Sequence, residues 1–139
     1  MAQPKFPYKT AYGQFAEDGA SYLIHRPDTP RPWVNVMSSG TYGVALSQTG
    51  SGYSWLNHAS LNRITRWNQD LIQDNWGRYL YVRDDDTGRF WSVGWQPVRA
   101  KHTSYEVIHG VGYTIINSEN EGIQAQWFVF VPADEPLEV

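Results

Sequence analysis

The sequence has no cysteine, and this absence excludes disulfide bonds, a cysteine nucleophile and cysteine-based metal sites. A cysteine-free chain suits the reducing cytoplasm, so we expect a cytoplasmic protein. No apolar run approaches the roughly 20 residues that are needed to span a bilayer. Residues 1–7 also lack the apolar core of a secretory signal. We therefore expect neither a membrane segment nor secretion.

Neither acidic nor basic residues strongly predominate in the sequence. The net charge of −3 arises from acids and bases that are interspersed along the 139 residues. Because there is no basic cluster of the kind that binds nucleic acid or an anionic membrane, we expect neither as a partner. The length fits a single domain that has a core of its own.

Spacings that are typical of catalytic or metal sites do not occur. The histidines are scattered, without the HExxH pattern of zinc enzymes, at His25, His58, His102 and His109. The acidic residues 84–86 suggest calcium, but the glutamate that completes a calcium-binding loop is absent and residues 85–88 are typical of a hairpin turn. The remaining acids also gather in turns, where solvation explains them. The sequence thus predicts no catalytic residue, no metal and no cofactor in this chain.

Aromatic residues are abundant, at 15% of the chain with seven Trp and nine Tyr, which favours β-structure. Short alternating segments bounded by turn residues predict about nine to eleven strands and no long helix. The predicted strands cover residues 12–15, 21–25, 33–37, 42–47, 78–84, 90–93, 104–109, 113–117 and 123–131. This pattern predicts an all-β, antiparallel β-sandwich.

Two segments interrupt the strand pattern. Residues 26–33 contain three prolines, which forbid a helix and a central strand and predict a rigid extended connector. Residues 56–76 have no period of 2, and we expect an ordered loop across one face rather than a short helical turn. A loop of this length in a small domain is usually functional or interfacial.

Residues 50–52, Gly-Ser-Gly, predict a tight chain reversal, because glycine accepts a positive φ. Tryptophan faces and arginine donors follow this reversal, and such side chains can bind the C–H faces and hydroxyl groups of a sugar. The candidate sugar contacts are Trp55, Arg63, Arg66 and Trp67. The alternative is that these tryptophans fill the sandwich core and the arginines lie at strand ends.

Several motifs follow one another in a familiar order. They include Gly77-Arg78-Tyr79-Leu80-Tyr81-Val82-Arg83-Asp84 and His109-Gly110-Val111-Gly112-Tyr113-Thr114, together with residues 26–35, 52–55, 63–66, 91–92 and 95–97. From about Tyr12 to Val139 the chain resembles the N-terminal region of the inverting disaccharide phosphorylases, glycoside hydrolase family 94, of which cellobiose phosphorylase is the type member.

The resemblance implies a larger enzyme. Members of the family begin with a β-sandwich of the supersandwich type, followed by a helical linker and an (α/α)6 barrel that carries the catalytic aspartate. They cleave a β-linked glucoside with inorganic phosphate as co-substrate, and they release an α-sugar 1-phosphate. Since the barrel is absent from this chain, the resemblance places the general acid and the phosphate site outside it. The partners so implied are a disaccharide or oligosaccharide and the remaining sandwich and barrel, in the same or a separate chain.

The resemblance also implies a homo-oligomer, because in this family the sandwich helps to form the dimer. We expect a flexible arm over residues 1–10 and a sandwich over residues 11–139, the latter being the first part of a larger sandwich that can be partial or complete here. Residues 132–139 are typical of a turn into a further strand. Two alternatives remain open: a stand-alone carbohydrate-binding module, and a subunit that assembles with a separately encoded barrel.

Overall fold

The computed structural model describes residues 9–68, 70 and 72–139, and these residues form strands and loops without a helix. The strands are β1 (Gly13–Phe15), β2 (Ser21–Ile24), β3 (Val34–Ser38), β4 (Tyr42–Ser47), β5 (Gly52–Leu56), β6 (Tyr81–Arg83), β7 (Phe90–Ser92), β8 (Ser104–Gly110), β9 (Tyr113–Asn120) and β10 (Ile123–Phe130). All strand pairs are antiparallel. The prediction of an all-β, antiparallel fold is therefore confirmed.

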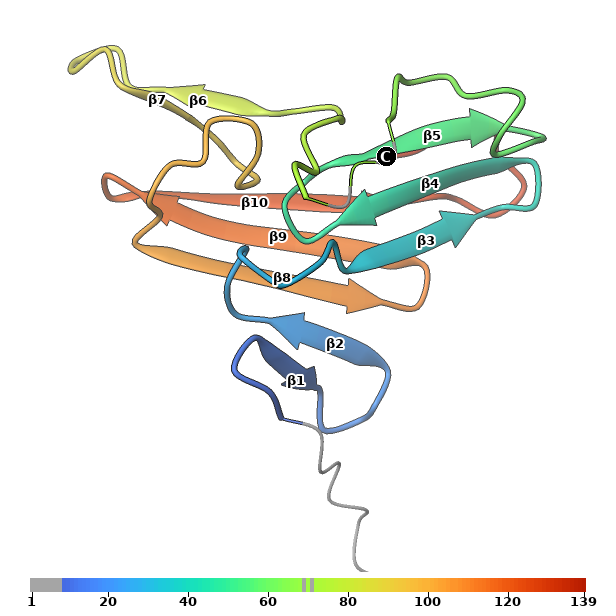
Figure 1. Ribbon diagram of the computed structural model, residues 1–139, viewed down its shortest axis with the longest axis horizontal. Coiled ribbons are helices and arrows are strands. Elements are labelled where there is room, and N and C mark those ends of the chain that lie inside the picture. The colour runs from blue at the N-terminus through green and yellow to red at the C-terminus, as the bar shows by residue number, and fades with distance from the viewer. Residues whose placement is uncertain (1–8, 69, 71) are drawn as a thin grey trace, which may run out of the picture.

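The strands form two packed layers and a separate hairpin. The larger sheet has the order β1-β2-β8-β9-β10, and the smaller sheet has the order β3-β4-β5. Figure 1 shows the smaller sheet lying across the β9–β10 side of the larger one, while β1 and β2 extend from the opposite edge. The β6–β7 hairpin projects at one end of the sandwich.

The core lies between the two sheets in two clusters. One cluster joins Met37, Val44 and Leu46 of the smaller sheet to Val129 of β10. The other cluster contains Ile24, Val107 and Ile116 of the larger sheet. The half-buried side chain of Trp127 packs against both clusters, so it connects the two parts of the core. Alternate residues of β10 face opposite sides, as the sequence predicts.

A polar clasp joins the two layers beside this core. The Asn35 side-chain amide on β3 donates to the carbonyl oxygens of Gly110 (2.9 Å) and Tyr113 (2.8 Å) in the β8–β9 hairpin. It also donates to the Thr114 hydroxyl at 3.1 Å. The His109 ring, on β8, contacts the same hydroxyl through Nδ1 and the Trp33 carbonyl oxygen through Nε2, each at 3.0 Å. Because a carbonyl only accepts, Nε2 carries the proton and Nδ1 accepts.

The half-buried His109 makes stability depend on pH. Desolvation by burial lowers the pKa of His109 to about 4, although the bond to the Trp33 carbonyl oxygen opposes this effect. In the unfolded chain the His109 imidazole is protonated below about pH 6.5, whereas in the folded chain it is protonated only below about pH 4. The free energy of unfolding therefore falls as the pH falls from 6.5 to 4. Between pH 7.5 and pH 5 we expect His109 to cost about 2 kcal/mol of unfolding free energy.

Urea unfolding of wild type and His109→Gln at pH 7.5 and pH 5 measures this contribution. The variant should lose about 2 kcal/mol of the difference between the two pH values, while His102, whose pKa is also lowered by burial, still contributes in the same direction. His58→Gln is the matched control, because His58 is exposed, and it should keep the wild-type difference. An unchanged pH difference in His109→Gln would show that another group is responsible.

Most of the predicted segments are found near their expected positions. Residues 26–33 form no strand. Of the predicted loop 56–76, Leu56 ends β5, and the described part of residues 57–76 is an ordered loop that folds back beside β5 through a bridge between Trp55 and Arg63. The sequence did not predict β5. Trp55, which we expected in a loop, lies on this strand. Val139 exchanges two backbone hydrogen bonds with Phe130, as expected of a turn after β10. Residues 1–8 of the predicted arm lie outside the described residues.

Among the described residues, no helix is long and apolar enough to cross a membrane.

Candidate functional site

The turn between β4 and β5, residues 47–52, is buried throughout and is the point where the loops of one end of the sandwich meet. The reversal is closed by hydrogen bonds from Ser47 N to Ser51 O (2.7 Å) and from Gly50 N to Ser47 O (3.1 Å). Gly50 has a φ of 86°, which glycine adopts without steric cost. The predicted tight reversal is therefore confirmed, but it lies in the interior and not on the surface.

Gln48 fixes the proline connector to this turn. Its side-chain amide donates to the Pro27 carbonyl oxygen at 2.9 Å, and its Oε1 accepts from Trp33 N at 2.8 Å. Its backbone carbonyl accepts from the Tyr105 hydroxyl at 2.7 Å. The Gln48 side chain is only 2% exposed, so these polar groups have little water to replace lost partners. Gln48 therefore fixes the connector near both of its ends, at Pro27 and at Trp33.

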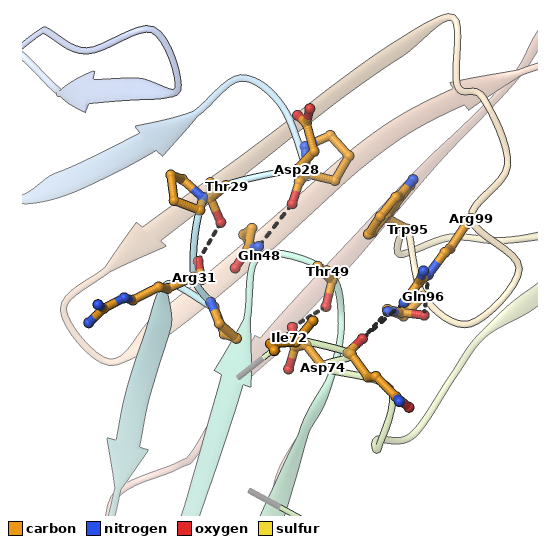
Figure 2. Close-up of a pocket in the computed structure, with 14 residues that line it drawn as sticks. Asp28, Thr29, Arg31, Gln48, Thr49, Ile72, Asp74, Trp95, Gln96 and Arg99 are labelled. Atoms are coloured by element: carbon orange, nitrogen blue, oxygen red, sulfur yellow. Dashed lines mark hydrogen bonds between the residues drawn. The ribbon is translucent and has the colours of Figure 1, made fainter. Parts of the chain in front are cut away.

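Three loops approach the same turn and line an open pocket of about 240 Å³. Figure 2 shows the proline connector on one side, the turn with Gln48 and Thr49 in the middle, and Asp74, Gln96 and Arg99 on the other side. Gln96 N donates to Thr49 O at 2.9 Å, and a side chain at Gly94 would collide with that same oxygen. We call this site the polar pocket. Its lining includes Thr29, Gln48, Asp74, Trp95, Gln96 and Arg99.

Asp74 supplies a half-buried carboxylate to this pocket. Its Oδ2 accepts from the hydroxyls of Ser47 (2.7 Å) and Thr49 (2.6 Å). Desolvation by burial raises the pKa of Asp74, while these two hydrogen bonds and the nearby Arg99 act in the opposite direction. Among the described residues, no hydrogen bond engages the second oxygen, Oδ1. The carboxylate is thus held in place with one acceptor oxygen uncommitted.

Trp95 and Arg99 form the facing wall. The Arg99 guanidinium lies 5.1 Å from the centre of the Trp95 ring, in a cation–π arrangement. It also donates from one terminal nitrogen to the Gln73 carbonyl oxygen at 3.1 Å, and from Nε to Gln96 Oε1 at 3.3 Å. Figure 2 shows the indole standing between Arg99 and the connector. The wall therefore combines an aromatic ring with a fixed cation.

A second feature lies on the face of the smaller sheet that points away from the core. Tyr53 and Trp67 stack with ring centres 4.8 Å apart, and Trp55 lies 5.4 Å from Tyr53. The Arg63 guanidinium lies 5.2 Å from the Tyr53 ring centre and 5.1 Å from that of Trp67. We call these four residues the aromatic–arginine cluster. Since these side chains contact one another, the cluster is already internally packed.

Three of the four predicted sugar contacts, Trp55, Arg63 and Trp67, thus lie together. Arg66 does not join them, because its guanidinium stacks on Trp76 at 4.7 Å. The sequence interpretation missed Tyr53, although its position two residues before Trp55 on one strand places both on the same face. It also missed the polar pocket, whose residues come from four separate segments without a local motif.

The histidine and aspartate groups that could suggest catalysis make local contacts in the described part of the chain. The histidine–hydroxyl pair that it contains, His109 with Thr114, is not reachable by a substrate because Thr114 is fully buried. Asp84 accepts from Asp86 N and the Thr87 hydroxyl, so its carboxylate stabilises a hairpin turn as predicted. No group of His, Cys, Asp and Glu within the described ranges could hold a metal ion.

The described strands define an antiparallel β-sandwich domain. The chain belongs to the supersandwich domain family of glycosyl hydrolase 94, whose family model matches residues 20–139. This confirms the resemblance to the inverting phosphorylase family and the supersandwich type of the fold.

The chain is similar to several phosphorylases. It is 41% identical over 131 residues to N,N'-diacetylchitobiose phosphorylase of Vibrio furnissii, an alignment that covers 92% of this chain and 16% of the relative. The enzyme of the same name from Vibrio proteolyticus is 37% identical over 130 residues, with the same two shares. Solabiose phosphorylase of Paenibacillus borealis is 33% identical over 131 residues, which are 92% of this chain and 17% of the relative. The chain thus spans about one sixth of the length of these relatives.

Proposed function

We propose that this chain is the N-terminal supersandwich portion of a sugar phosphorylase that acts on β-linked glucosides. The supporting observation is the family match over residues 20–139, together with identities above 30% to phosphorylases that are much longer. In this proposal an aspartic acid in a separate barrel protonates the leaving oxygen. Inorganic phosphate attacks the anomeric carbon from the opposite face and yields an α-sugar 1-phosphate. Phosphate replaces the water and base carboxylate of an inverting hydrolase.

The role that we assign to this chain is structural and interfacial. Phe128 on β10, which is 48% exposed, begins an apolar row that continues through Ile115 and Ile108 to Leu23 on the neighbouring strands. The row lies on the sheet face opposite the core, because the adjacent residues Trp127 and Ile116 point inward. Phe128 is exposed and the other three residues of the row are half-buried, so the row presents a partly exposed apolar surface that favours contact with another protein surface. We propose that this face contacts the rest of the enzyme and that the enzyme is a cytoplasmic homo-oligomer.

Phosphorolysis by the polypeptide that carries this chain tests the proposal. The purified protein is incubated with cellobiose or N,N'-diacetylchitobiose, with and without inorganic phosphate, and the sugar 1-phosphate is measured. We expect an α-sugar 1-phosphate that forms only in the presence of phosphate, and no turnover by residues 1–139 alone. Hydrolysis that is independent of phosphate, or no cleavage across a wide range of β-linked disaccharides, would refute the activity.

A second candidate function is that the chain binds carbohydrate. The predicted sugar contacts for this function are Trp55, Arg63, Arg66 and Trp67. The gathering of three of them with Tyr53 supports it. If the aromatic–arginine cluster binds sugar, Trp67→Ala or Trp55→Ala should abolish the affinity of the chain for gluco-oligosaccharides. Titration calorimetry measures this loss directly.

A further inference from the structure

We propose that the polar pocket binds a single neutral pyranose ring, and that it is the sugar-binding site of this chain in place of the aromatic–arginine cluster. The pocket of about 240 Å³ lies below the roughly 300–1,000 Å³ range of drug-sized ligand sites, which favours a small ligand. It goes beyond the phosphorylase activity proposed above, because it concerns binding by residues of this chain.

The pocket is built by buried polar groups, which fix its shape. Gln48 and Gln96 are 2% and 1% exposed, and both side-chain amides are used to connect loops. Gln96 Nε2 donates to the Gln73 carbonyl oxygen at 2.6 Å, so the segment that carries Asp74 is tied to the segment that carries Trp95 and Arg99. The recognition groups of the pocket are therefore held before any ligand enters, which lowers the entropic cost of binding.

The groups that remain available match the two kinds of surface on a pyranose. The Asp74 Oδ1 can accept from a sugar hydroxyl, since Oδ2 already has two donors. The Arg99 guanidinium provides further N–H donors, and charge-assisted hydrogen bonds of this kind are stronger than neutral ones. Arg99 lies over one face of the Trp95 ring, so the ring offers its remaining apolar surface to the C–H groups of the sugar. The carboxylate and the guanidinium can thus bind the hydroxyl groups of a sugar, while the indole packs against its C–H groups.

The pocket lining holds two carboxylates and two guanidinium groups, so its formal charges cancel and do not favour an anion over a neutral sugar. In the aromatic–arginine cluster, by contrast, Tyr53 and Trp67 stack on each other and Arg63 lies over both rings. The pocket beside Tyr53 and Trp67 has a volume of only about 90 Å³, whereas the polar pocket has a volume of about 240 Å³. This difference is the reason for assigning binding to the pocket.

The test is a titration of the 139-residue chain with methyl β-D-glucopyranoside, followed by calorimetry and by the NMR signals of the tryptophan indoles. We expect a Kd of about 1 mM, with the Trp95 indole signal shifting while those of Trp55 and Trp67 do not. Inorganic phosphate is titrated in parallel and should produce no shift. Phosphate binding without glucoside binding, or shifts confined to Trp55 and Trp67, would overturn the inference.

Variants separate the two sites. Asp74→Asn and Arg99→Gln should each weaken glucoside binding by at least about tenfold, a change of about 1.4 kcal/mol. Trp67→Ala abolishes binding if the aromatic–arginine cluster holds the sugar, whereas binding in the polar pocket predicts an affinity within about twofold of wild type. Asp86→Asn, an exposed turn residue, is the matched control for Asp74→Asn. Thermal unfolding verifies that each variant is folded. If Asp74→Asn does not fold, the binding measured for Arg99→Gln decides the outcome. Unchanged binding in the folded pocket variants would overturn the inference and leave the phosphorylase proposal untouched.

Discussion

Gly52→Ala should abolish the native fold or lower the free energy of unfolding by more than about 4 kcal/mol. Gly52 begins β5 and has a φ of 151°. A β-carbon at this position would lie 1.8 Å from the Ala45 carbonyl oxygen on β4, which is far inside van der Waals contact. The overlap involves the backbone of the paired strand, so no side-chain rotation relieves it. The Gly52 N–H also donates to the Trp76 carbonyl oxygen at 2.7 Å, and any shift of β5 would break this bond.

Gly88→Ala is the matched control for this effect. Gly88 has a φ of 70° in the exposed turn between β6 and β7, and a β-carbon there meets nothing within 4 Å. The substitution should therefore cost only about 1–2 kcal/mol for the left-handed backbone. Thermal unfolding of both variants measures the difference. Equal destabilisation by the two substitutions would show that the close approach of β4 and β5 is not the cause.

Gln48→Ala should lower the free energy of unfolding by roughly 3–4 kcal/mol. The substitution leaves the Pro27 carbonyl and the Trp33 N–H without their partners, and a buried polar group without a partner costs about 1–3 kcal/mol. A small cavity between the connector and the turn adds to this cost. The loss should appear as a lower urea midpoint with an unchanged slope, because the change in exposed surface on unfolding is nearly the same.

Gln124→Ala provides the comparison for Gln48→Ala. Gln124 is exposed on β10 and donates one hydrogen bond to Glu119 at 3.2 Å, so its removal should change stability by less than about 0.5 kcal/mol. If Gln48→Ala were as mild as this control, then the proline connector would not be held by its contacts with Gln48. The polar pocket, which has the connector as one wall, would then be less rigid than the hydrogen bonds indicate.

The strand pattern was readable because it depends on local chemistry. The alternation of Trp127 and Val129 with Phe128 and Phe130 places the first pair toward the core, since a strand has a period of 2. The prolines of residues 26–33 exclude a strand for the same local reason. β5 was missed because its residues, Gly-Tyr-Ser-Trp-Leu, alternate small with aromatic side chains, and the small ones face the core. Ser54 and Gly52 are buried, which reverses the usual hydrophobic pattern.

The candidate site was less readable, because its residues are brought together by contacts that are distant in sequence. Asp74 bonds to Thr49 across 25 positions, and Gln96 to Gln73 across 23. No spacing rule connects such pairs. The predicted sugar contacts were only partly brought together. Trp55 and Trp67 both contact Tyr53, but Arg66 stacks on Trp76 because the loop folds back beside β5. Loop paths of this kind depend on tertiary packing, which propensities do not encode.

The central claim, that this chain is one domain of a larger phosphorylase, is tested most directly by the size of the native polypeptide. An antibody raised against residues 11–139 and applied to an extract of the source cells would detect it, and mass spectrometry would give its intact mass. We expect a polypeptide several times longer than this chain, because the chain spans about one sixth of its relatives. A native polypeptide of 139 residues would contradict the claim, and titration with sugars would then decide whether the chain acts as a carbohydrate-binding module.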